Sequence, residues 1–186
     1  MRTKQFRVLL SIFILLVFLG ALPTPLPAQD SNTIKARALV DAAIKMTDSE
    51  KAVKLLWQAT DIDPTLQEAY LYLGLYYQSK QDFNDLVKVY QKLVKYKPND
   101  ATGWINIGEA YMSFTPPKTK EALPYYRKGY ELDPNSSWAA LRIGEILAQQ
   151  GDRTGAIRYL RQASADSKNP SAAAEAQKML SQMGAS

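Results

Sequence analysis

The chain has 186 residues, which allows one domain with a tail, and its hydrophobic (46%) and charged (22%) fractions are those of a folded globular protein. It contains no histidine and no cysteine, which excludes zinc sites built from those residues, histidine acid–base catalysis, Ser-His-Asp or Cys-His nucleophiles and disulfides. The net charge is +5, but residues 1–28 hold three of the 23 basic residues and none of the 18 acidic ones, so the remainder carries only +2. This small excess does not provide the concentrated basic patch of a nucleic-acid-binding protein.

The first 28 residues have the three-part pattern of a secretory signal. Residues 1–7 are basic, residues 8–19 are almost wholly apolar, and small residues and prolines follow as far as Ala28. We predict a signal peptide over 1–28 that is cleaved after Ala28. The alternative is an uncleaved membrane anchor, although the apolar stretch 8–22 is shorter than the roughly 20 residues that span a bilayer. In both cases the rest of the chain is expected to face away from the cytoplasm, because the positive end stays inside.

After a short linker (29–32), the sequence repeats with a period of about 34 residues. Pro64, Pro98 and Pro134 are 34 and then 36 residues apart. At constant spacing after each proline come an aromatic residue or alanine, an aliphatic-glycine pair, and a tyrosine or leucine. These positions are Tyr70, Leu73-Gly74 and Tyr77; Trp104, Ile107-Gly108 and Tyr111; and Ala140, Ile143-Gly144 and Leu147. Apolar residues three and four apart within each unit predict two helices per repeat.

This pattern resembles the tetratricopeptide repeat (TPR) family. The resemblance covers 33–168, in units at about 33–64, 65–98, 99–134 and 135–168. It implies an all-α fold, a right-handed α-solenoid of about four helix-turn-helix repeats, with 169–186 as a capping helix and tail. Helices of about 14 residues are marginal alone, so stacking must stabilise them.

The resemblance also implies a concave groove, lined by the first helix of each repeat, that holds an extended peptide or a helix of a partner protein. The repeat register predicts a peptide-binding set of Leu71, Leu75, Ile105, Asn106, Glu109, Met112, Trp138, Leu141, Arg142 and Glu145. A partner segment would be anchored by the apolar members and oriented by the polar ones. For Leu71, Ile105 and Leu141 the alternative is that their neighbours cover them. Because Ala140 replaces the packing aromatic of other units, Trp138 is expected to point into the groove.

Two special activities are not expected. One subset of the family holds a C-terminal carboxylate with a clamp of Lys, Asn, Asn, Lys and Arg, and only Asn106 and Arg142 match that clamp here. Glu109 and Glu145 fall on the same face one repeat apart, but an open groove does not form the closed pocket that a catalytic carboxylate pair needs. We therefore predict no catalytic residue, no metal and no cofactor.

Together these features predict an exported protein-binding scaffold, periplasmic or secreted. By analogy with the family, it would assist the assembly of an envelope complex. The alternative is a structural subunit of a membrane complex, tethered through residues 8–22 and facing outside the cytoplasm. The sequence predicts neither the partner's identity nor the oligomeric state.

Overall fold

The computed structural model of the chain describes residues 30–185, and every regular element in this part is an α-helix. The helices are α2 (Ser31–Ile44), α3 (Ser49–Ile62), α4 (Gln67–Ser79), α5 (Phe83–Tyr96), α6 (Ala101–Met112), α7 (Thr119–Leu132), α8 (Ser137–Gln149), α9 (Arg153–Ser164) and α10 (Pro170–Gln182). The segment predicted to be a signal or anchor, 1–28, lies outside the described residues. The first helix begins two residues inside the predicted linker, within the usual uncertainty of a helix end.

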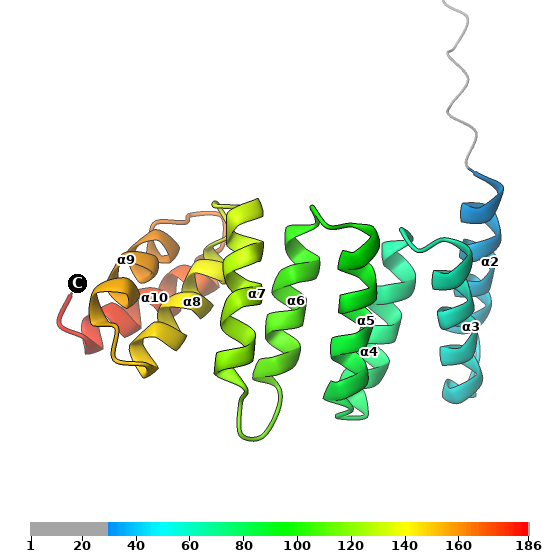
Figure 1. The fold of residues 1–186 in the computed structure, drawn as a ribbon, viewed down its shortest axis with the longest axis horizontal. Helices are drawn as coiled ribbons and strands as arrows, with labels where there is room; N and C mark the ends of the chain where they lie inside the picture. The colour runs from blue at the N-terminus through cyan, green and yellow to red at the C-terminus, as the bar shows by residue number, and fades with distance from the viewer. Residues whose placement is uncertain (1–29, 186) are drawn as a thin grey trace, which may run out of the picture. The chain divides into compact units, whose positions relative to one another are not determined.

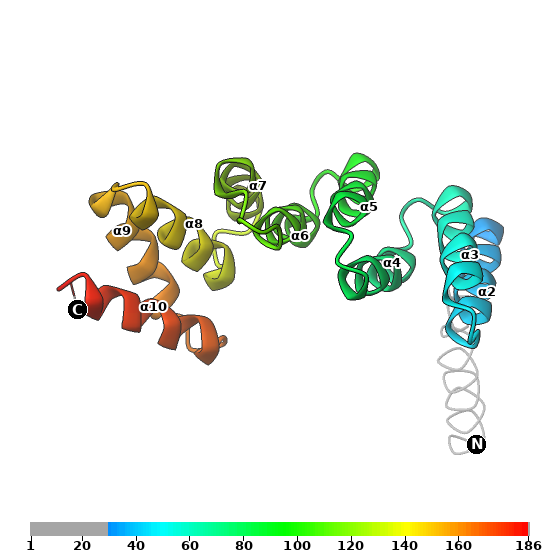
Figure 2. The same ribbon diagram turned by 90° about the horizontal axis from the view of Figure 1, so that it is seen from below.

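The helices pack in chain order. From α3 to α10 each helix contacts the next, and α10 also contacts α8 (Figure 1). A shared apolar cluster joins α2 to α3 and α4. Figure 2 shows α5 and α7 in one layer and α4 and α6 in another. We call α2, α4, α6 and α8 the first helices and α3, α5, α7 and α9 the second helices. The predicted all-α solenoid of helix pairs, closed by a final helix, is confirmed.

The predicted register recurs in the packing of the first helices. The hydroxyl of Tyr70 donates to the carbonyl of Pro64 at 3.0 Å, and the indole N–H of Trp104 donates to the carbonyl of Pro98 at 2.8 Å. In both repeats the aromatic side chain of the first helix is thus hydrogen-bonded to the proline that ends the preceding repeat. Ala140 occupies the same position in α8, where it is buried without a side chain that could make this bond.

Glycine is required where the two helices of a repeat approach closely. A Cβ atom added at Gly108 would lie 2.7 Å from a ring carbon of Tyr126, and one added at Gly144 would lie 2.8 Å from Leu160. These distances are shorter than carbon–carbon contact allows. The recurring glycine of the sequence pattern therefore provides room for a large residue of the second helix.

Aspartate side chains cap three of the second helices, α3, α5 and α9. The carboxylate of Asp48 accepts from the amides of Glu50 and Lys51, and Asp152 accepts from the amide of Gly155 at 2.9 Å. Each such cap contributes about 1 kcal/mol to helix stability. Among residues 30–185, no helix combines the length and apolarity needed to cross a bilayer.

Candidate protein-binding face

The first helices of the N-terminal repeats expose large apolar side chains. Leu71 and Leu75 lie one turn apart on α4, and each is 54% exposed. Ile34 on α2 is 55% exposed. Fully burying a side chain of this size is worth about 1.5–3 kcal/mol, so covering this surface would be favourable. The predicted set did not include Ile34, although the repeat register gives it the position in α2 that Trp138 has in α8.

One charged pair borders these apolar side chains. The guanidinium Nε of Arg37 on α2 lies 3.8 Å from a carboxylate oxygen of Glu68 on α4, too far for a hydrogen bond. Both side chains are about half exposed, and Arg37 Nε has no hydrogen-bond partner. This pair contributes little to stability in its present geometry. Arg37 Nε itself is buried, so a partner would contact the exposed remainder of the two side chains.

Three predicted residues on α6 are only half-buried. Ile105 lies against Gly129 of α7, and Met112 packs on the apolar cluster that contains Tyr126. Asn106 lies beside Ile105 and is also half-buried. Ile105 and Met112 support the packing of α6 on α7, and all three side chains keep part of their surface exposed.

The polar members of the predicted set contact one another. One carboxylate oxygen of Glu109 accepts from the Tyr126 hydroxyl at 2.7 Å, the Trp138 indole at 2.9 Å and the Arg142 Nε at 3.0 Å. Arg142 also donates to Glu145 at 2.9 Å, and its guanidinium lies 4.5 Å from the Trp138 ring centre. The structure therefore brings together four predicted residues from two repeats, with Tyr126 added. We call these five residues the Glu109 network.

Burial and neighbouring charges shift the pKa values of Tyr126 and Arg142 in the Glu109 network. Burial raises the pKa of Tyr126, and the neighbouring Glu109 carboxylate raises it further, so the phenol stays neutral and donates. Burial alone would lower the pKa of Arg142, but Glu109 and Glu145 outweigh burial and raise it. Arg142 therefore remains charged, pairs with both carboxylates and offsets one of their two negative charges. The network ties α8 to α6 and α7.

One expectation about α8 needs correction. Leu141 is fully buried in a cluster with Leu160 and Leu180, because alanines on α8 and α10 allow these helices to approach closely. The prediction that Leu141 contacts a partner is therefore wrong, and the alternative that its neighbours cover it holds. Trp138 is half-buried, with its N–H bonded to Glu109 and Arg142 against its ring, and its contact with a partner in the groove stays a prediction.

No sequence pattern indicates the role of Tyr126. Its position is that of an ordinary packing aromatic, and its bond to Glu109 depends on the approach of α7 to α6. Within the described residues, no group of three or more acidic side chains is placed to hold a metal ion.

Comparisons with known proteins identify the repeat. A sequence profile described as "Tetratricopeptide repeat" matches residues 118–183, and a second with the same description matches 67–100. Superkiller complex protein 3 of Homo sapiens is 29% identical over 63% of this chain. Hsp70-Hsp90 organizing protein 3 of Arabidopsis thaliana is 32% identical over 57% of it. These matches span only 8% and 19% of the two relatives.

Similar solved structures have the same repeat fold. The TPR2B domain of yeast Sti1, solved in a pHsp70 complex, has a TM-score of 0.55 and 27% identity, covering 63% of this chain and 94% of that domain. PcrH, solved with the chaperone binding region of PopD, has a TM-score of 0.57 and 25% identity, covering 64% and 91%. MamA, at 17% identity and a TM-score of 0.63 over 83% of this chain and 84% of its own, supports the fold alone.

Proposed function

Because the chain belongs to the tetratricopeptide repeat family, we propose that it is an exported scaffold that binds an apolar segment of a partner protein across α2 and α4. The observation that carries this proposal is the exposure of Ile34, Leu71 and Leu75 on neighbouring first helices. Two proteins with this fold, Sti1 and PcrH, were solved with segments of other proteins. They support a protein-binding role.

The composition of the first helices favours an apolar partner segment. Around Leu71 and Leu75 the flanking charges are Arg37 and Glu68, which are of opposite sign and partly exposed. Farther along the chain, the charges of the Glu109 network are already paired with one another. A partner would therefore gain most from burying aliphatic side chains on α2 and α4, with the Arg37–Glu68 pair setting its orientation.

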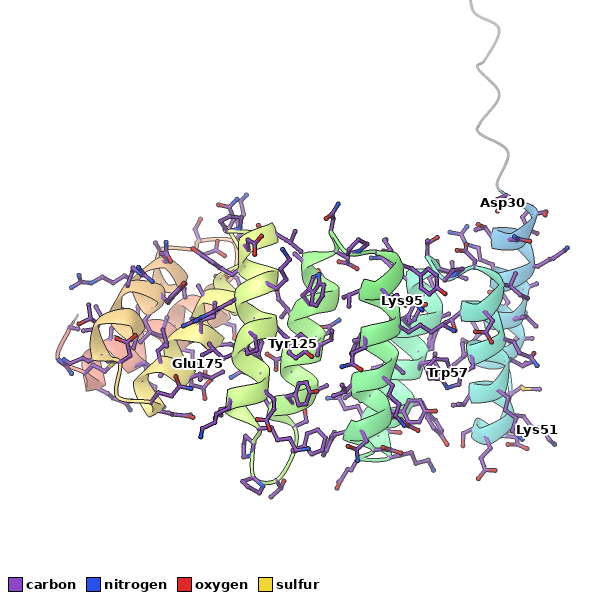
Figure 3. The ribbon with its side chains drawn as sticks, in the orientation of Figure 1. Asp30, Lys51, Trp57, Lys95, Tyr125 and Glu175 are labelled. Atoms are coloured by element: carbon purple, nitrogen blue, oxygen red, sulfur yellow. The ribbon has the colours of Figure 1, made fainter. Side chains whose placement is uncertain are left out.

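Capture of partners by the full chain tests this function. The double variant Leu71→Asp and Leu75→Asp should lose the bound partner, because two carboxylates replace the apolar contacts. The matched control is Gln58→Asp with Gln91→Asp, the same two substitutions by aspartate at exposed positions on α3 and α5. Figure 3 labels Trp57 and Lys95, which mark this layer of second helices. Equal capture by both double variants would contradict the proposal, provided that their circular dichroism spectra are the same.

Export and envelope assembly form the second part of the proposal. Export is supported by the basic and apolar pattern of residues 1–28, and envelope assembly rests on analogy with the family. Intact-mass measurement of the protein from the cells that make it separates the two alternatives. A chain that begins at Gln29 supports export with cleavage, whereas a membrane-bound chain with Met1 intact supports the tethered subunit.

A further inference from the structure

A surface pocket of about 470 Å³ lies where α7, α8 and α9 meet. It is lined by Ala140 of α8 together with residues from the ends of α7 and α9 and the loops that follow them. The lining residues are Tyr130, Pro134, Asn135, Ser136, Ser137, Ala140, Gln162, Ala165, Asp166 and Lys168. None of them belongs to the predicted peptide-binding set or to the Glu109 network. The pocket is therefore distinct from the surface proposed above.

In the two preceding repeats the chain fills this place with its own aromatic side chain. Tyr70 and Trp104 hold the position of Ala140, and each donates a hydrogen bond to the proline carbonyl that ends the preceding repeat. In the fourth repeat the corresponding carbonyl belongs to Pro134. Alanine has neither the ring nor the donor, and Trp138 does not replace it because its indole is bonded to Glu109. The fourth repeat therefore has an alanine where the second and third repeats have an aromatic side chain.

The walls of the pocket are held in place by contacts of their own. Tyr130 donates to Gln162 at 2.9 Å, and its ring packs edge-on against Tyr159 with centres 5.5 Å apart. Ser137 is buried, and its hydrogen bond to Asp166 lowers the pKa of that carboxyl. A preformed wall reduces the conformational cost of binding.

The chemistry of the lining matches an aromatic ring with a polar tip. The Tyr130 ring and Pro134 offer apolar surface, the Pro134 carbonyl is an acceptor, and Lys168 at the rim carries a cation that can lie over a ring. We propose that this pocket, the aromatic slot, receives a tryptophan or tyrosine side chain of a partner protein. The incoming ring takes the position that Tyr70 and Trp104 occupy in their own repeats. Its N–H or O–H donates to the Pro134 carbonyl.

Nuclear magnetic resonance titration of the full chain with N-acetyl-tryptophanamide tests the aromatic slot. Saturable shifts are expected at the amides of Ser137, Ala140 and Gln162, with a Kd on the order of millimolar for a single side chain. N-acetyl-leucinamide, which has no ring, should bind at least about tenfold more weakly, because it lacks the stacking surface and the side-chain donor. Equal binding of the two probes, or no saturable shift at these amides, would overturn the proposal.

A variant that blocks the pocket tests whether the tryptophan probe binds in the aromatic slot. Ala165 is exposed at the end of α9 and lines the pocket. The substitution Ala165→Trp should cover the pocket and therefore lower the affinity for N-acetyl-tryptophanamide at least about tenfold. The matched control is Ala42→Trp, which adds the same ring at an exposed alanine of α2. Unchanged affinity in Ala165→Trp would overturn the assignment. If that variant does not fold, the two wild-type titrations still decide.

Discussion

Removing the carboxylate of Glu109 should destabilise the stack, because this side chain joins three helices. The substitution Glu109→Ala leaves the hydroxyl of Tyr126, the indole of Trp138 and the guanidinium of Arg142 without their common acceptor. Arg142 retains Glu145, so it does not become a fully unpaired charge. The decrease in unfolding free energy should therefore be smaller than that caused by removing one partner of a fully buried ion pair.

The magnitude follows from the burial of each donor. Tyr126 is fully buried, and a buried donor left unsatisfied costs about 1–3 kcal/mol. Trp138 and Arg142 are half-buried and can recover part of their hydration, so together they add about 1 kcal/mol. A total of about 2–4 kcal/mol should lower the unfolding temperature by roughly 4–16 °C for a domain of this size. Glu109→Gln should cost less, because its amide oxygen still accepts from Tyr126.

Thermal and urea unfolding of the full chain measure this effect. The matched control is Glu175→Ala, the same substitution at an exposed site on α10 that is labelled in Figure 3. The control should stay within about 0.5 kcal/mol of the wild type. If Glu109→Ala is as stable as the control, the Glu109 network does not hold the repeats together and the reasoning fails.

Two further predictions concern packing and pH. Gly108→Ala should cost about 1–3 kcal/mol in unfolding free energy, because the added Cβ meets the fixed ring of Tyr126 at 2.7 Å; an unchanged melting temperature would show that the ring has room to move. Burial alone would raise the pKa of Asp63, but hydrogen bonds from Thr65 and Thr33 outweigh it and hold the pKa below its ordinary value. Asp63 therefore stabilises the fold above about pH 4, and this contribution is lost as the pH falls through its folded pKa. Asp63→Asn should be less stable than the wild type at pH 7 and should lose less stability between about pH 4 and pH 2, which urea unfolding at each pH measures. If the unfolding free energies of the variant and the wild type fall in parallel over this range, Asp63 does not make the proposed contribution.

The repeat architecture could be predicted because it depends on local, recurring positions. Tyr70 and Trp104 are 34 residues apart and make equivalent bonds to equivalent prolines, so spacing alone identified them. The recurring Gly108 and Gly144 identified the close helix contacts in the same way. Periodicity fixes which residues face a neighbouring helix, and this is why the fold was confirmed.

The side-chain partners on the first helices could not be predicted in this way. The repeat register places Glu109, Arg142 and Trp138 on one face, but whether they bind a partner or one another depends on side-chain geometry across two repeats. Leu141 became a core residue because α10 approaches α8 more closely than a regular repeat pattern implies. Both differences arise near the C-terminal end of the stack, where a capping helix replaces a further repeat.

Site-specific photo-crosslinking tests whether a partner polypeptide lies across α2 and α4. Three variants would be made in the cells that produce the protein. A photoreactive phenylalanine analogue would replace Leu71 in one variant, Ile34 in the second, and Lys95 on the second helix α5 in the third. We expect Leu71 and Ile34 to crosslink to the same apolar segment of one partner and Lys95 not to crosslink to it. Crosslinks from Lys95 to that segment, with none from Leu71 or Ile34, would contradict this prediction.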